Sequence, residues 1–291
     1  MKAGRLGRWC VENISDDRLF VLIKGLYRTG CLLNVRQPRT FQEKLQWIKL
    51  HDRKEIYHRM VDKEEMKAYV RERVGEGHTV PTLGCWNSFD DIDWESLPDS
   101  FVLKNTYDSG SYILCRDKST FDRQEARRKL EKGGYRDYYK ESREWPYKGL
   151  SHRIIAEPLL NDGNGEWLTD YKFYTFNGEP RLFYITSGRG SREGLKETFF
   201  DMEGNVMDLS QKGYKPADPL PPLPRHLKEM AAMARDLAQG TLHLRVDFYE
   251  VGDKVCCGEL TFFDGGGFAL FIPDKWNREL GDWIDLNNIE R

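Results

Sequence analysis

The chain of 291 residues is long enough for a large core, and its 13% aromatic content argues against a disordered protein. A net charge of −2 supplies no basic field that would attract nucleic acid. The six cysteines include no CxxC pair and no cysteine–histidine spacing typical of zinc, so we expect reduced thiols in a cytoplasmic protein. No stretch approaches about 18 uninterrupted apolar residues, so no membrane span is predicted. Met1–Cys10 also lacks the apolar stretch of a signal peptide.

The first part of the chain is predicted to be helical. Amphipathic helices are expected to begin near Ser15, near Thr40, near Asp52 or Lys54, and at Asp62. Ser15 is the expected cap of the first helix, and Thr40 with Glu43 forms a capping box for the second. None of these helices carries a catalytic constellation.

A buried strand that ends in Lys104 is followed by a small polar loop over residues 105–111 and by a second strand from Tyr112. Strand, lysine and small-residue loop suit phosphate binding, because the lysine brings a charge and the loop N–H groups can wrap phosphate oxygens. An ordinary hairpin with a lysine reaching solvent explains the same pattern.

A second pair of strands is predicted after a charged helix that starts at Arg123 and stops at Gly133. One strand reaches Glu157 and is followed by an apolar tripeptide that ends at Leu160, an arrangement that can bind adenine. The next strand, over residues 168–176, carries Asp170, Lys172 and Tyr174 on one face, and Asn177-Gly178 indicates a type I′ turn.

Two arginines and two glycines form the loop over residues 187–192. Arg189 and Arg192 in this loop can hold an anionic acceptor, but the same composition fits a flexible solvated loop. A stiff proline-rich connection over residues 218–224 and a helix over residues 224–238 follow.

The most informative pattern is a predicted hairpin around Gly252-Asp253. Alternation places Asp247 opposite Glu259, with Arg245 and Thr261 beside them and Cys257 on the same face as Glu259. Because opposed carboxylates destabilise a sheet, a cation between them is expected, and Mg²⁺ carrying a nucleotide phosphate suits this donor set. A solvated strand face with an Asp–Arg pair is the alternative.

Taken in order, several segments resemble the TupA-like ATP-grasp family, which is named for teichuronopeptide biosynthesis. The resemblance covers about Lys44–Leu286. The segments are FQEKLQWIKLHDR, Met60–Lys63, FVLKNTYDSG, REWPYK, RIIAEPLL, DYKFYTFNGEP, RVDFYEV, GELTFF and LGDWI. The resemblance implies an α+β ATP-grasp fold in which two α+β subdomains clamp ATP. The implied parts are an N-terminal helical segment (1–78), a small subdomain (79–156) and a C-terminal subdomain with the metal-binding hairpin (157–291).

The resemblance also implies roles for individual residues. A strand lysine and the small loop would contact the phosphates, a strand end with its apolar tripeptide would hold adenine, and residues of later strands would contact ribose and phosphates. In chain order these residues are Lys104; Thr106, Ser109, Gly110 and Ser111; Glu157 and Leu160; Asp170, Lys172 and Arg245.

Asp247 and Glu259 resemble the Mg²⁺ ligands of the family. Thr261 stands where many members of the superfamily have Asn, and a hydroxyl is a weaker ligand than an amide oxygen. Arg245, Lys172 and Arg189 are the expected catalytic cations, because Arg189 or Arg245 can stabilise an oxyanion.

The implied reaction is ATP-dependent joining of a carboxylate to an amine through an acylphosphate. We expect an amino acid or peptide and a uronic acid or similar carboxylate as substrates, in the biosynthesis of a cell-surface polysaccharide. The alternatives are a sugar or polyol kinase, a glycosyltransferase-like polysaccharide enzyme and a non-catalytic scaffold. Water must be excluded from an acylphosphate, so the loops at Thr106–Tyr112 and Gly265–Gly267 are expected to close over the site.

Overall fold

The computed structural model describes residues 14–289 except 109, 135 and 162–167. The expectations for Met1–Cys10, for Ser109 and for most of the turn after Leu160 therefore lie outside the described residues. The helices are α2 (Asp17–Thr29), α3 (Phe41–His51), α4 (Ile56–Val61), α5 (Glu65–Val74), α6 (Arg123–Gly134), α7 (Tyr138–Ser142), α8 (Leu227–Leu237) and α9 (Lys275–Asp282).

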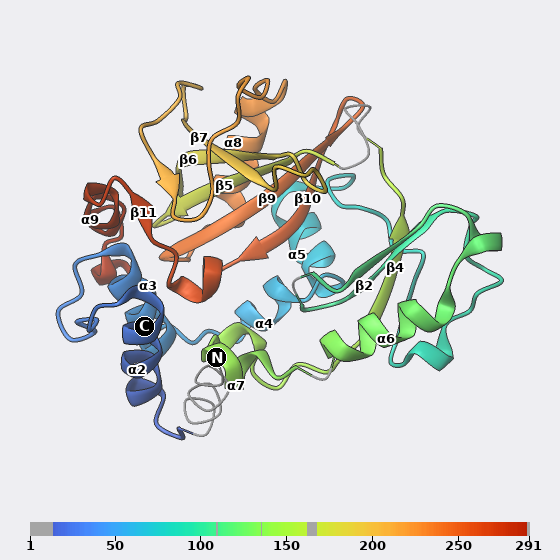
Figure 1. Cartoon of the computed structure of the whole chain (residues 1–291), viewed down its shortest axis with the longest axis horizontal. Coiled ribbons are helices and arrows are strands. Elements are labelled where there is room, and N and C mark those ends of the chain that lie inside the picture. Colours follow the sequence, from blue (N-terminus) through green and yellow to red (C-terminus); the bar gives the residue numbers. More distant parts are fainter. Residues whose placement is uncertain (1–13, 109, 135, 162–167, 290–291) are drawn as a thin grey trace.

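The strands form two main antiparallel sheets and a short pair. The five-stranded sheet has the order β10 (Lys254–Thr261), β9 (His243–Val251), β5 (Asp170–Phe176), β6 (Glu179–Ser187) and β7 (Lys196–Asp201). The four-stranded sheet has the order β1 (Gly84–Trp86), β4 (Ile154–Pro158), β2 (Phe101–Asn105) and β3 (Tyr112–Cys115), and β11 (Phe271–Ile272) pairs with β8 (Ser210–Gln211). Figure 1 shows the larger sheet above and the smaller sheet to the right. Helices and antiparallel sheets confirm the α+β class.

The larger sheet carries most of the core. Phe173, Phe183 and Phe248 are fully buried and pack against one another, and α8 packs against β5, β6 and β9. On the opposite face of the sheet, Phe41 of α3 stacks on Tyr174 with ring centroids 6.2 Å apart. The N-terminal helices therefore contribute to the core of the larger sheet, and the expected three-part division of the chain stays a prediction.

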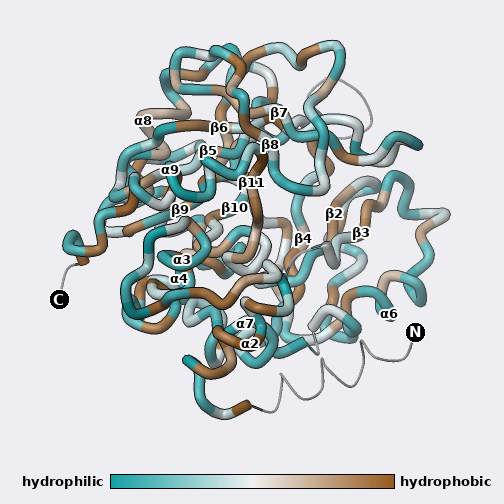
Figure 2. The backbone as a smooth tube through the Cα atoms, turned by 60° about the vertical axis from the view of Figure 1, so that its left-hand side comes forward, coloured by the Kyte–Doolittle hydropathy of each residue, from teal (hydrophilic) through white to brown (hydrophobic). Residues whose placement is uncertain are grey.

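The smaller sheet has a core of its own. Phe101 and Leu103 of β2 are fully buried with Ala126 and Leu130 of α6. Because side chains alternate along a strand, Lys104 lies on the other face of β2, away from α6. Figure 2 shows hydrophobic stretches in the strands of both sheets and hydrophilic stretches along the outer loops.

Local signals in the sequence account for several of these elements. The Thr40–Glu43 capping box is present, and Asn177 and Gly178 have the positive φ values (50° and 84°) of a type I′ turn. The expected cap of α2 is wrong by one residue: the carboxylate of Asp16 accepts from the Leu19 amide at 2.7 Å. A carboxylate there also favours the positive end of the helix dipole.

One register prediction in the hairpin is wrong. Glu259 pairs with Asp247 and Thr261 with Arg245 as expected, but they do so through a bulge at Gly258, and on the turn side of this bulge Cys257 pairs with the buried Phe248. The extra residue of a bulge reverses the alternation on one side of it. Cys257 therefore faces the core and not the side of Glu259.

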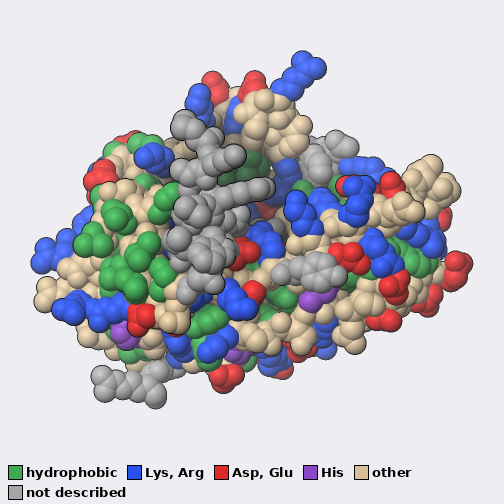
Figure 3. All heavy atoms as spheres, turned by 60° about the horizontal axis from the view of Figure 1, so that its bottom comes forward, with side chains coloured by type: hydrophobic (Ala, Val, Ile, Leu, Met, Phe, Trp, Pro, Cys, Tyr) green, Lys and Arg blue, Asp and Glu red, His purple; other side chains and the backbone are tan. Residues whose placement is uncertain are grey.

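The surface carries mixed charge, as a net charge of −2 leads one to expect. On the face drawn in Figure 3, Lys and Arg side chains are interspersed with Asp and Glu, and hydrophobic side chains gather on the left of the view. Within the part of the chain that the structure describes, no helix is long and apolar enough to cross a membrane.

Candidate active site

A cleft between the two sheets collects most of the predicted site residues. Its polar half is lined by Gly110, Ser111, Lys172, Arg245, Asp247 and Glu259. Its apolar half is lined by Val80, Val102, Leu114, Pro158, Leu159 and Leu160. The two halves adjoin, because Lys104, Tyr112, Asp170, Arg189 and Tyr249 line both. Residues as far apart in the chain as Val80 and Glu259 thus share one cleft.

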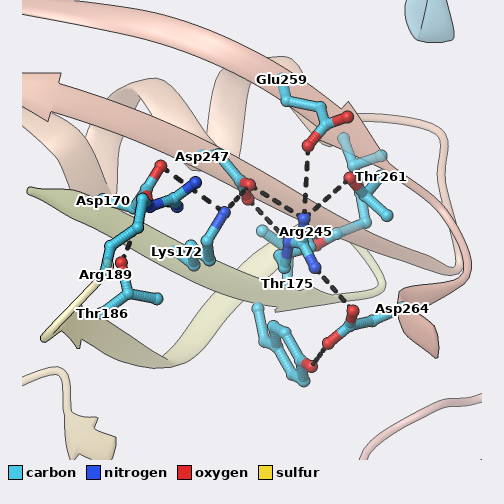
Figure 4. A network of polar contacts seen from close by, with 12 residues as sticks. Asp170, Lys172, Thr175, Thr186, Arg189, Arg245, Asp247, Glu259, Thr261 and Asp264 are labelled. Carbon is cyan, nitrogen blue, oxygen red and sulfur yellow. Dashed lines mark hydrogen bonds and ion pairs between the residues drawn. The ribbon is translucent and has the colours of Figure 1, made fainter. Parts of the chain in front are cut away.

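The polar half centres on Arg245, which lies among acids from three segments (Figure 4). Its guanidinium donates to both carboxylate oxygens of Asp247, at 2.7 and 2.9 Å, and to Asp264 at 2.7 Å. Glu259 lies 3.5 Å away, and the Thr261 hydroxyl accepts at 3.1 Å. The cation expected between Asp247 and Glu259 is therefore supplied, in this structure, by an arginine of the protein.

Electrostatics hold these groups in their charged forms. Burial acts to lower the pKa of Arg245, but the charges of Asp247 and Asp264 keep it well above its ordinary value. Burial acts to raise the pKa of Asp264, but Arg245 and the hydroxyl of Tyr174, which donates at 2.5 Å, lower it. The cluster is an ion network at neutral pH.

A second group of charges adjoins the first on β5. Lys172 pairs with Asp247 and lies 3.8 Å from Asp170. Asp170 also accepts from Arg189 and from the Thr186 hydroxyl. Burial acts to raise the pKa of Asp170, but the charges of Lys172 and Arg189 lower it. Arg189, predicted from a loop that also fits a solvated segment, thus lies in the cleft.

The segment predicted to bind adenine, from Glu157 to Leu160, begins with an ion cluster. The Glu157 carboxylate accepts from Lys104 at 2.6 Å and pairs with Lys67 at 2.8 Å. Burial acts to raise the pKa of Glu157, but the charges of Lys104 and Lys67 lower it. Glu157 is thus held by its side chain, which leaves its backbone and Leu160 to line the apolar half.

The predicted phosphate loop is divided. Gly110 and Ser111 line the cleft, but Thr106 is fully buried and is not brought to it. The Thr106 amide donates to Arg153, and its carbonyl accepts from the Lys63 amide at 2.6 Å. Lys63 also donates from its side chain to the Asp108 carbonyl at 2.7 Å. The first half of this expected closing loop is therefore tied to Lys63, in the link between α4 and α5.

The second expected closing loop is anchored as well. The Gly266 carbonyl accepts from Lys49 at 2.6 Å, and the Gly267 carbonyl accepts from Gln46 at 2.8 Å. A Cβ at Gly267 would lie 2.6 Å from the Gln46 amide nitrogen, so the turn Asp264–Gly267 fits closely on α3. This close fit holds Asp264 against Arg245. The contacts thus anchor the turn on α3, whereas the sequence predicted a loop that closes over the site.

A model of the TupA-like ATP-grasp family matches residues 43–285, which is most of the chain. The chain belongs to this family. The ATP-grasp fold inferred from Lys44–Leu286 is thereby confirmed. No curated protein matches the chain.

Three solved structures similar to the chain are ATP-grasp ligases or synthetases. D-alanine–D-alanine ligase from Bacillus anthracis, complexed with ATP, is 16% identical with a TM-score of 0.41, covering 70% of this chain and 55% of that protein. The Helicobacter pylori D-alanine–D-alanine ligase is 12% identical (TM-score 0.41; 78% and 61% covered). N5-carboxyaminoimidazole ribonucleotide synthetase from Thermus thermophilus is 14% identical (TM-score 0.40; 78% and 49% covered). The chain spans less than two thirds of the length of each.

The expected metal donors Asp247, Glu259 and Thr261 form an incomplete set by themselves. Among the residues described, no group of three or more His, Cys, Asp or Glu is arranged to hold a metal ion. Asp247 and Glu259 are directly paired across β9 and β10, and the Thr261 hydroxyl lies on the same face. Two carboxylates with open positions fit Mg²⁺ that brings further oxygens from phosphates and water.

The sequence reasoning missed several residues of the cleft. Strand alternation places Tyr249 on the face of Arg245 and Asp247, but no site role was predicted for it. Lys63 lies in a segment that carried the family resemblance. Asp264 and Lys67 had no local signal, because only the folded chain brings them to Arg245 and Glu157.

Replacing Gly258 with alanine tests how closely Gly258 packs against Tyr249 at the edge of the cleft. A Cβ there would lie 2.3 Å from the Tyr249 ring, so the ring must shift. We expect Gly258→Ala to lower the free energy of unfolding by about 1–3 kcal/mol and to weaken ATP binding. Urea unfolding and calorimetric titration with ATP measure the two effects. Lys254→Ala, at the exposed start of the same strand, is the control, and equal results for both variants would contradict the packing role.

Proposed function

We propose that the protein is an ATP-dependent carboxylate–amine ligase that works through an acylphosphate and releases ADP and phosphate. The proposal rests on membership of the TupA-like ATP-grasp family together with one observation. The paired acids Asp247 and Glu259 share a cleft with Lys104, Lys172 and Arg245. Acids for a metal and cations for phosphates are the two requirements of a phosphoryl-transfer site.

ATP fits the division of the cleft into two halves. The apolar half, with Leu159, Leu160 and Val102, suits the adenine ring, and the polar half suits the triphosphate. Lys104 lies at the junction of the halves, where it can reach a phosphate oxygen. In this proposal residues 79–156 and 157–291 are the two clamping subdomains.

Mg²⁺ would be held by Asp247 and Glu259, with Thr261 as a weaker donor. When bound, it neutralises the charge that develops on the phosphate oxygens. Without a metal, the carboxylates of Asp247 and Glu259 repel each other across the two strands. Arg245 contacts both carboxylates and reduces this repulsion.

The reaction then runs in two steps. An oxygen of the substrate carboxylate attacks the γ-phosphorus of ATP, ADP leaves, and Lys172 and Arg245 spread the developing charge. The amine nitrogen attacks the carbonyl carbon of the acylphosphate, a C–N bond forms, and phosphate leaves with the electron pair of the broken C–O bond. Arg189, which also lines the cleft, would stabilise the oxyanion.

We propose an amino acid or peptide and a uronic acid or similar carboxylate as substrates, in the biosynthesis of a cell-surface polysaccharide. The family name supports this choice, and Arg189 in the cleft suits an acidic substrate.

A screen of ADP release tests the reaction class. Uronic acids are crossed with amino acids in the presence of ATP and Mg²⁺, and mass spectrometry identifies the products. We expect ADP release to require both partners and the product to have lost one water. ADP release that needs no amine and gives a phosphorylated sugar would identify a kinase instead. Absence of a thermal shift with ATP would contradict nucleotide binding altogether.

A further inference from the structure

Glu197 of β7 lies on the face of the larger sheet that forms the cleft. The register runs from Asp170 across to Thr186 of β6 and on to Glu197, so the three side chains share one row. Asp170 lines the cleft and accepts from Thr186. Glu197 therefore extends the polar face of the site two strands beyond β5.

One oxygen of the Glu197 carboxylate is buried without a hydrogen-bond partner among the described residues. The residue is 5% exposed, and this oxygen is Oε2. The nearby cations are engaged elsewhere: Lys172 pairs with Asp247, and Arg245 with Asp247 and Asp264. A buried carboxylate that lacks a partner costs free energy, so this residue is suited to a cationic group from outside the chain.

A partly exposed tyrosine lies near this carboxylate. Tyr214 is 36% exposed and lies close enough to Glu197 and Asp264 for both to influence its pKa. The Glu197 amide donates to the Lys215 carbonyl at 3.0 Å, which joins this segment to β7.

We propose that Glu197 binds the ammonium group of the amine substrate and takes its proton before the attack on the acylphosphate. This inference rests on the proposed ligase function and adds the seat of the second substrate. The nitrogen is held two strands from Lys172, on the side of the sheet face opposite the hairpin acids Asp247 and Glu259.

The proton balance is complete without a further reactant. The ammonium gives one proton to the Glu197 carboxylate, and the freed lone pair forms the C–N bond. When phosphate leaves, it takes the second proton from nitrogen, so the products are a neutral amide and hydrogen phosphate. Glu197 then releases its proton to solvent.

The electrostatic surroundings suit this role. Burial, followed by the charge of Asp264, raises the pKa of Glu197 to about 7, and Arg245 and Lys172 oppose the rise. Tyr184 also lies near this group, and burial raises its own pKa well above the ordinary value, so it stays a neutral phenol. A base with a pKa near the working pH transfers protons most effectively.

Glu197→Gln tests the inference with two nucleophiles. Each uronic acid is incubated with ATP and Mg²⁺, once with the twenty standard amino acids and once with hydroxylamine, which is largely unprotonated at neutral pH. We expect the variant to form hydroxamate within about twofold of the wild-type rate. Amide formation at pH 7 should fall about 10²-fold or more, because general-base catalysis is lost.

The pH dependence gives a second readout that a purely structural role would not produce. In the wild-type protein amide formation should rise with pH and level off above about 7, the pKa of Glu197. In Glu197→Gln it should keep rising about tenfold per pH unit towards the pKa of the amine. If the variant does not fold, the wild-type profile decides, because a rise without the plateau would overturn the inference.

Glu193→Gln, at an exposed carboxylate four residues upstream that pairs with Lys196, is the matched control and should behave as wild type. Wild-type amide formation by Glu197→Gln would overturn the inference while leaving the ligase function intact, and so would an equal loss of amide and hydroxamate. Absence of ATP-dependent hydroxamate in the wild-type protein would instead overturn the proposed function itself.

Discussion

Replacing Glu259 with alanine should reduce amine-dependent ADP release by at least about 10²–10³-fold, the effect of losing one group that stabilises transition-state charge. The fold should survive, because the Glu259 side chain is about one-third exposed and its contact with Arg245 is 3.5 Å long. We expect the free energy of unfolding to change by less than about 1 kcal/mol. Steady-state ADP release and urea unfolding measure the two quantities.

The Mg²⁺ dependence separates a metal ligand from a residue that acts in another way. Loss of a ligand should raise the Mg²⁺ concentration needed for half-maximal rate at fixed ATP. Asp253→Ala is the control, because Asp253 is a carboxylate of the same hairpin that is 94% exposed. Wild-type turnover in Glu259→Ala would remove Glu259 from the site.

Arg245→Met should be the most destabilising single change in the cleft. It removes the partner of Asp247, whose side chain is 1% exposed, and of Asp264, whose side chain is 14% exposed. Removing one member of a buried ion network leaves uncompensated charges, which typically costs about 3–5 kcal/mol. Urea unfolding at pH 7 measures this loss, and ATP affinity should fall with it.

The loss should depend on pH in a defined direction. Arg245 lowers the pKa of Asp264, so its stabilising effect is present above the ordinary carboxyl pKa and disappears as pH falls through the lowered value. The difference between wild type and Arg245→Met should therefore shrink in acid. Arg225→Met, at an exposed arginine that pairs with Asp253, should change stability by less than about 0.5 kcal/mol at any pH. A loss that is constant with pH would contradict the ion-network explanation.

Much of the fold could be predicted because its signals are local. The Thr40–Glu43 box, the Asn177-Gly178 turn and the alternation that places Arg245 beside Asp247 each depend on neighbours within a few residues. The predicted pairing of Asp247 with Glu259 is present, but the register that the short turn sets, with Val251 opposite Lys254 and Phe248 opposite Cys257, does not by itself produce it. The bulge at Gly258, which alternation does not predict, moves Glu259 opposite Asp247.

The sequence by itself thus determined the family, the hairpin acids and the lysine of β2. Only the tertiary structure decided which charges meet. Asp264 reaches Arg245 because glycines dock its turn on α3, Lys67 meets Glu157 from another segment, and Thr106 is buried away from the cleft. The physical reason is that backbone periodicity acts over a few residues, whereas the pairing of buried charges depends on how distant segments pack.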